Sequence, residues 1–137
     1  MVAIDYAAAA IERARTVLPA GVAQRVLRQA DFFEFEAQPF DWIYERAFLP
    51  ALPPPMWRRW AEHLPRLLAP AGELIGNFFV DAELPQPRRG PPFVTTRAEL
   101  DALIGTGFAC LEDVPVPPGD SLPVFAGRER WMRWLHK

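Results

Sequence analysis

Several features that mark particular protein classes are missing from this sequence. Its single cysteine, Cys110, cannot form a disulfide within the chain, which suits a reducing compartment such as the cytoplasm. No apolar run approaches the roughly 20 residues that a membrane-spanning helix needs, and MVAIDY has no basic leader typical of a signal peptide. The net charge of -2 gives no basic surplus for nucleic acid. We therefore expect a cytoplasmic protein without a membrane or nucleic-acid partner.

Metal-binding and hydrolytic motifs are also scarce. The two histidines, His63 and His136, do not combine with Cys110 in the spacing of a zinc site, so no metal is predicted. No Gly-x-Ser-x-Gly turn is present, and the only partial phosphate-loop pattern fails because residue 77 is Asn where the second glycine should stand. Carboxylates and arginines at the ends of predicted strands are the candidates that remain.

The 137 residues, 50% of them hydrophobic, suffice for one domain with a core, so residues 1–137 are expected to form a single domain. Apolar periodicity predicts strands at 2–5, 25–29, 40–44, 74–80 and 108–114, helices at 7–18, 57–68 and 96–104, and a strand or short helix at 128–136. This order predicts an α/β fold whose sheet is mostly parallel and ends in an antiparallel C-terminal hairpin.

The segment 39–80 organises the chain as a strand–helix–strand unit. The short apolar run 40–44 is typical of a strand buried on both faces. The helix that follows has one apolar face, and Pro70 and Gly72 are expected to end it. Further along, Thr96 and Glu99 have the spacing of a capping box.

Acidic residues at two predicted strand ends are candidates for binding a nucleoside. Asp5 could accept hydrogen bonds from ribose hydroxyls, or it could cap the helix at 7–18. Asp31 is followed by two phenylalanines, which suits an adenine ring but equally suits a turn beside the core. Local sequence leaves both alternatives open at both positions.

Glu45 and Arg46 form a second candidate pair. They lie directly beyond the carboxyl end of the strand at 40–44, which is where open α/β sheets bind ligands. The alternative is an ordinary pair of surface charges in a loop.

Together, five stretches resemble the class I S-adenosylmethionine-dependent methyltransferases, and among them the thiopurine S-methyltransferase-like family of thiol and halide methyltransferases. They are VAIDYAAAAIERAR, QADFFEF, FDWIYERAFLPALPPPMWRRWAEHLPRLLAPAGELI, RGPPF and GRERW. The resemblance implies a Rossmann-like sheet, S-adenosyl-L-methionine as methyl donor, and a small thiol or similar soft nucleophile as acceptor. The residues do not indicate which acceptor is used.

The resemblance also implies roles for individual residues. Asp5 would bind the ribose, Tyr6 would be a further cofactor-binding residue, and Asp31 with Phe32 would lie at the adenine. Arg46 would be the active-site arginine near the sulfur chemistry and would bind the acceptor, and Glu45 would be a second catalytic residue. Phe93 would form a wall of the acceptor pocket.

One departure from the family pattern concerns the N-terminus. The family has an earlier strand with a Gly-x-Gly turn, and this sequence begins at what corresponds to the second strand. We therefore expect an N-terminally truncated sheet, weak or absent cofactor binding, and self-association through an exposed sheet edge. The alternatives are a non-catalytic binding or regulatory module completed by another chain, and a nucleotide-binding α/β enzyme of another class.

Overall fold

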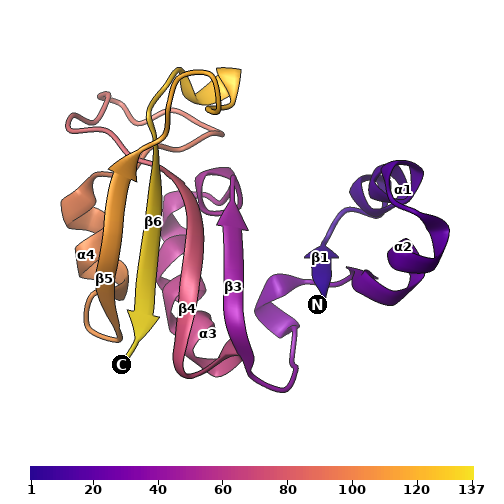
Figure 1. The fold of residues 1–137 in the computed structure, drawn as a ribbon. Helices are drawn as coiled ribbons and strands as arrows, with labels where there is room; N and C mark the ends of the chain where they lie inside the picture. The colour runs from indigo at the N-terminus through magenta and orange to yellow at the C-terminus, as the bar shows by residue number, and fades with distance from the viewer. The chain divides into compact units, whose positions relative to one another are not determined.

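The predicted alternation of strands and helices is present in the computed structural model, which describes residues 1–137 (Figure 1). The chain divides into unit 1, Met1–Ala37, and unit 2, Gln38–Lys137. None of its helices is both long enough and apolar enough to cross a membrane.

Unit 1 is built on two short parallel strands. Its elements in order are β1 (Ala3–Asp5), α1 (Ala8–Val17), α2 (Ala20–Val26), β2 (Leu27–Gln29) and the 3-10 turn η1 (Phe32–Glu34). Asp5 lies opposite Gln29 in the β1–β2 register, so both strands end at the same edge. A small core of Ile11, Ala23 and Leu27 joins the helices to β2.

The strand predicted at 25–29 is wrong over its first two residues. Residues 25 and 26 belong to α2, and the strand begins only at Leu27. Pro19 starts α2, because its carbonyl accepts hydrogen bonds from the N–H groups of Val22 and Ala23. A helix of seven residues is too short to show a clear apolar period, so the sequence pattern did not reveal it.

Unit 2 contains a four-stranded sheet in the order β3-β4-β6-β5. Its strands are β3 (Phe40–Arg46), β4 (Leu68–Phe79), β5 (Phe108–Pro115) and β6 (Glu129–His136). β3 pairs with β4 in parallel, whereas β6 runs antiparallel to both β4 and β5. The parallel pairs and the antiparallel C-terminal hairpin confirm the predicted α/β arrangement.

Helices α3 (Trp57–Leu67) and α4 (Arg97–Ile104) contact each other and lie on the same face of this sheet (Figure 1). The predicted apolar face of α3 is confirmed by its buried side chains, Trp57, Trp60, Ala61, Leu64 and Leu67. The capping box of α4 is also confirmed. Thr96 Oγ1 accepts from Glu99 N at 3.1 Å, and a Glu99 carboxylate oxygen accepts from Thr96 N at 2.9 Å.

Two expectations for the central unit are wrong. Helix α3 ends at Leu67, before Pro70 and Gly72, and Leu68 already belongs to β4. Nor is β3 buried on both faces, since Trp42 and Tyr44 are 69% and 59% exposed. The reason is that Trp42 and Tyr44, two positions apart, share one face of the strand, whereas α3 and α4 both cover the other face of the sheet (Figure 1).

Candidate active site

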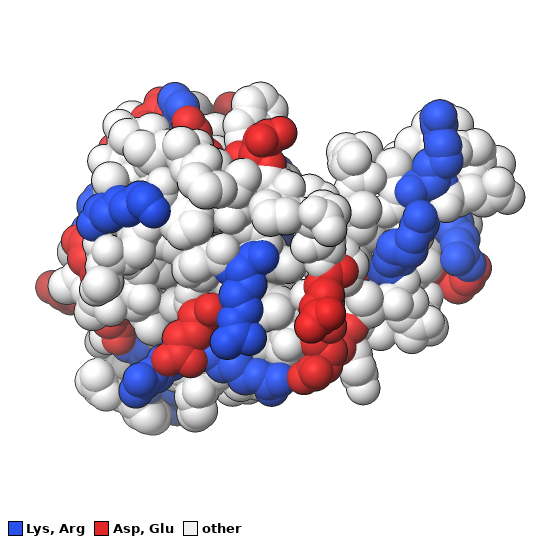
Figure 2. Space-filling view, turned by 90° about the horizontal axis from the view of Figure 1, so that it is seen from below, with Lys and Arg blue, Asp and Glu red and all other residues white.

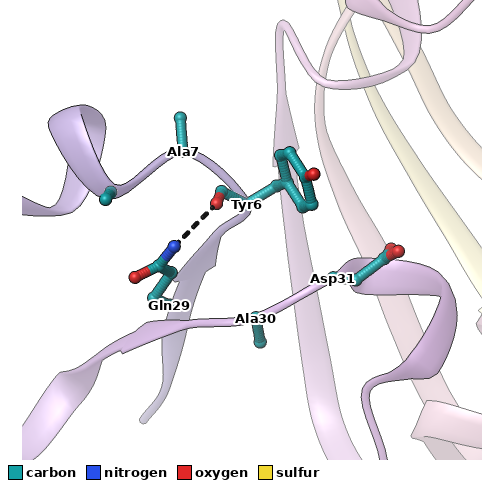
Figure 3. Close-up of a pocket in the computed structure, with 6 residues that line it drawn as sticks. Tyr6, Ala7, Gln29, Ala30 and Asp31 are labelled. Atoms are coloured by element: carbon teal, nitrogen blue, oxygen red, sulfur yellow. Dashed lines mark hydrogen bonds between the residues drawn. The ribbon is translucent and has the colours of Figure 1, made fainter.

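A pocket of about 450 Å³ opens at the carboxyl ends of β1 and β2 in unit 1. It is lined by Tyr6, Ala7, Ala8, Gln29, Ala30 and Asp31. Figure 3 shows the Gln29 amide reaching the Tyr6 carbonyl, a hydrogen bond of 3.2 Å, while the Asp31 carboxylate points away from Gln29. Ligand pockets in proteins usually have volumes of about 300–1,000 Å³, so this one has room for a nucleoside.

Asp5 immediately precedes the pocket and shapes the chain there. Its Oδ1 accepts from the N–H of Ala7 at 2.7 Å, and Ala7, not Asp5, is the N-cap residue of α1. The helix-cap alternative for Asp5 is therefore wrong in detail, because the carboxylate closes the turn that leads into the helix. Its Oδ2 is not needed for that turn.

Asp31 has a similar local role. It is the N-cap of η1, and its Oδ1 accepts from Phe33 N at 2.9 Å. Phe32 and Phe33 meet edge to face with ring centroids 5.3 Å apart. Phe32 is half-buried and is not among the residues that line the pocket, whereas the ring of Tyr6 is 77% exposed at its mouth.

In unit 2, Glu45 is buried at the carboxyl end of β3. Its Oε1 accepts from the N–H groups of Phe48 and Leu49, both at 2.8 Å, and so holds the turn after the strand. Its Oε2 is buried without a hydrogen bond. Burial outweighs the two N–H bonds and, with the nearby charge of Glu129, raises the pKa of Glu45 from 4.5 to about 7. Glu45 therefore holds a proton on a large fraction of molecules at neutral pH.

Arg46 points to a different set of groups. Its Nη2 donates to the carbonyl of Asp120 at 3.1 Å, and its Nε lies 3.7 Å from Oε1 of the buried Glu129. The Arg46 side chain remains 33% exposed. It is a half-buried guanidinium held by a loop and a carboxylate, rather than a free surface charge.

Phe93 is joined to the same turn through the backbone. Its N–H donates to the carbonyl of Pro50 at 2.7 Å, and Pro50 lies in the 3-10 turn η2 (Leu49–Ala51) that Glu45 holds. The ring of Phe93 packs on Gly90, where an added Cβ would lie only 2.5 Å from it. Glu45 and Phe93 thus both bind the turn at 48–51, whereas Arg46 binds the loop at Asp120.

Two residues next to Glu45 and Arg46 were not identified from the sequence. Glu129 lies within the GRERW stretch, but its burial depends on a β6–β4 pairing that joins residues 50 positions apart, Glu129 opposite Phe79. Gly76 lies opposite Glu45, and a Cβ there would come within 1.8 Å of the Glu45 carbonyl oxygen. An isolated glycine in a strand pattern is the signal that could have indicated this close approach.

Comparison with known families adds to this geometry. The family model of thiopurine S-methyltransferase matches residues 1–137. The chain belongs to this family. Thiopurine S-methyltransferase of Pseudomonas aeruginosa (strain UCBPP-PA14) is 35% identical over 121 residues, which cover 85% of this chain and 53% of that protein. Probable thiol methyltransferase 2 of Arabidopsis thaliana is 32% identical over 119 residues, covering 83% of this chain and 51% of that protein. The chain of this thiopurine S-methyltransferase family member therefore spans about half the length of these two curated relatives.

Solved structures show the same fold at low sequence identity. N-methyltransferase NodS from Bradyrhizobium japonicum WM9, in complex with S-adenosyl-L-homocysteine, matches 97% of this chain and 64% of its own with a TM-score of 0.71 and 22% identity. Magnesium protoporphyrin IX methyltransferase from Synechocystis PCC 6803, with bound S-adenosylmethionine, matches 98% of this chain and 58% of its own with a TM-score of 0.67 and 16% identity. The predicted Rossmann-like methyltransferase fold is thereby confirmed for this family member.

Proposed function

We propose that this chain carries the nucleoside-binding and acceptor-binding residues of an S-adenosylmethionine-dependent methyltransferase that acts on a small thiol or similar soft nucleophile. The observation that carries the proposal is the pocket at the carboxyl ends of β1 and β2, with Asp31 and the exposed ring of Tyr6 in its lining. Ligands of open α/β sheets bind at this edge. Membership of the thiopurine S-methyltransferase family supports this proposal.

The residues of unit 1 fit the adenosine end of S-adenosylmethionine. Asp5 and Asp31 each use Oδ1 on a backbone N–H, which leaves Oδ2 of each to accept from a ribose hydroxyl or an exocyclic amine. Tyr6 offers an aromatic face, and we assign Phe32 to a place beside the adenine. No residue of the chain is assigned to the methionine end.

When bound, S-adenosylmethionine supplies a methyl group on a positively charged sulfur. The acceptor sulfur forms a bond to this methyl carbon while the bond to the donor sulfur breaks and its electron pair stays on the leaving thioether; the thiol proton goes to solvent. Such a displacement needs alignment and exclusion of water more than a strong base.

We assign Arg46 to the acceptor, because a guanidinium favours the thiolate form of a nearby thiol. A protonated Glu45 would keep a second negative charge away from Glu129, the partner of Arg46, while it holds the turn at Phe48 and Leu49. Phe93 would contribute an apolar wall. Self-association through the edge strand β3 and a cytoplasmic location are further parts of the proposal.

Substitution of Arg46 tests the assignment. Arg46→Ala should lower the turnover of a thiol by about tenfold or more, because a charge-assisted contact is worth about 1.5–3 kcal/mol. Transfer of a labelled methyl group from S-adenosylmethionine to a panel of small thiols measures the effect. The control is Arg58→Ala, since Arg58 lies on α3 with its side chain 86% exposed. Equal turnover of the two variants would remove Arg46 from the mechanism.

A further inference from the structure

We propose that Glu129 is a positioning residue, whose buried carboxylate fixes both the guanidinium of Arg46 and the loop at 120–122 with which Arg46 makes its hydrogen bond. The inference deepens the proposed function, because it rests on the role of Arg46 toward the acceptor. It concerns only residues of unit 2.

The carboxylate of Glu129 is fully enclosed. Glu129 begins β6 opposite Phe79, and its side chain has no exposed surface. Its Oε2 accepts from Ser121 Oγ at 2.8 Å and from Leu122 N at 2.7 Å. Its Oε1 is buried without a hydrogen bond and lies 3.7 Å from Arg46 Nε. One oxygen thus binds the loop, and the other faces the guanidinium.

Arg46 is held from two directions by this arrangement. Its Nε faces Glu129, and its Nη2 donates to the carbonyl of Asp120, the residue directly before the two that Glu129 binds. The loop and the guanidinium therefore keep their relative position through a single carboxylate. An arginine has five N–H donors, so these contacts leave others for an anionic ligand.

A purely structural role accounts poorly for this carboxylate. Burying an ion pair is costly, and apolar residues of similar volume usually fill such a place at least as favourably. The neighbourhood holds a second buried acid, Glu45, whose Oε2 also lacks a hydrogen bond. Two buried acids close enough to influence each other, one of them beside a half-exposed guanidinium, are typical of a site in which charge is arranged for a ligand.

The test compares Glu129→Gln with a matched control, Glu73→Gln, in the chain as it stands. Glu73 also binds an arginine across the sheet, with both its oxygens 2.8 Å from nitrogens of Arg133. The readout is the solvent-exchange rate of the Arg46 Nε–H, measured by nuclear magnetic resonance and identified by its loss in Arg46→Lys. We expect the rate to rise about tenfold or more in Glu129→Gln, because a buried negative charge 3.7 Å from Nε is removed, and to stay unchanged in Glu73→Gln. An unchanged Arg46 rate in folded Glu129→Gln would overturn the proposal.

A second measurement tests the proposal in the unsubstituted chain, in case the Glu129→Gln variant does not fold. In the unsubstituted chain the Arg46 Nε–H should exchange about tenfold or more slowly than that of the exposed Arg13 on α1. Equal rates would contradict the contact. Neither measurement needs a cofactor or an acceptor, so a failure of methyl transfer is distinguishable from a failure of this inference.

Steady-state kinetics distinguish a positioning role of Glu129 from a general contribution of Glu129 to the stability of the fold. Glu129→Gln should raise the KM for a thiol by about threefold or more while the KM for S-adenosylmethionine stays constant. A parallel rise of both constants would overturn the positioning role.

Discussion

Glu45 is a buried acidic residue at the carboxyl end of β3. It accepts two backbone N–H groups and leaves its other oxygen without a partner inside the protein. A buried carboxyl group of this kind binds its proton more tightly in the folded state than in the unfolded chain. The stability of the folded state should therefore depend on pH through Glu45.

Because the pKa of Glu45 is raised to about 7, this group adds stability that is fully present below about pH 4.5 and is lost as the pH rises through 7. The loss is on the order of 3.5 kcal/mol at most, because each unit of pKa corresponds to about 1.4 kcal/mol. Glu45→Gln keeps an oxygen for the two N–H groups but does not titrate. We expect urea unfolding at pH 5 and pH 8 to differ clearly in the unsubstituted chain and much less in Glu45→Gln.

Glu62→Gln is the control for this experiment, since Glu62 is 60% exposed on α3. It should show the same pH dependence as the unsubstituted chain. A Glu45→Gln variant with the full pH dependence would show that another group is responsible.

At the scale of elements, the close approach of β3 and β4 fixes the positions of Glu45 and Arg46. Gly76 lies opposite Glu45, and any side chain there would collide with the backbone of β3. Glu45 and Arg46 both depend on this pairing, because they are the last two residues of β3. A change in β4 should therefore disturb the site without touching either side chain.

Gly76→Ala should destabilise the protein by about 2–4 kcal/mol, because backbone atoms must move apart to admit the methyl group. The control is Gly21→Ala in α2, where an added Cβ meets nothing within 4 Å and alanine is favoured by up to about 1 kcal/mol in a helix. Midpoints of urea unfolding measure both. Similar stabilities of the two variants would contradict the close approach.

Elements governed by local sequence were the ones predicted well. The capping box of α4 needs only Thr96 and Glu99, and the apolar face of α3 depends on the spacing of side chains along one helix. The exposure of Trp42 depends on which face of the sheet the helices cover, and the burial of Glu129 depends on which strands become neighbours. No short stretch of sequence specifies either. The sequence indicated Asp31, Glu45 and Arg46 as candidates, but it could not reveal that Glu129 lies beside Arg46.

At the scale of the whole molecule, the two units differ in the size of their cores. On one face of unit 2 acidic and basic side chains lie interspersed (Figure 2), and ion pairs such as Arg133 with Glu73 join them across the sheet. Unit 1 has 37 residues and only a small core. Domains below about 40 residues rarely fold without further support.

We therefore expect the two units to unfold together, as the single-domain prediction for residues 1–137 requires. All five tryptophans lie in unit 2, so their fluorescence reports on that unit, while the amide signals of β1 and β2 report on unit 1. The two transitions in urea should have the same midpoint. Separate midpoints would show two independently folding bodies.

The most direct test of the proposed function is a titration of the chain with S-adenosylhomocysteine followed by nuclear magnetic resonance, which detects even millimolar binding. The account predicts saturable shifts confined to unit 1 around Tyr6–Ala8 and Gln29–Asp31, with affinity lowered about tenfold in Asp31→Ala. The sequence led us to expect weak or absent binding, and weak binding would appear as a high dissociation constant. No shifts at the highest ligand concentration, or shifts elsewhere that Asp31→Ala leaves unchanged, would contradict it.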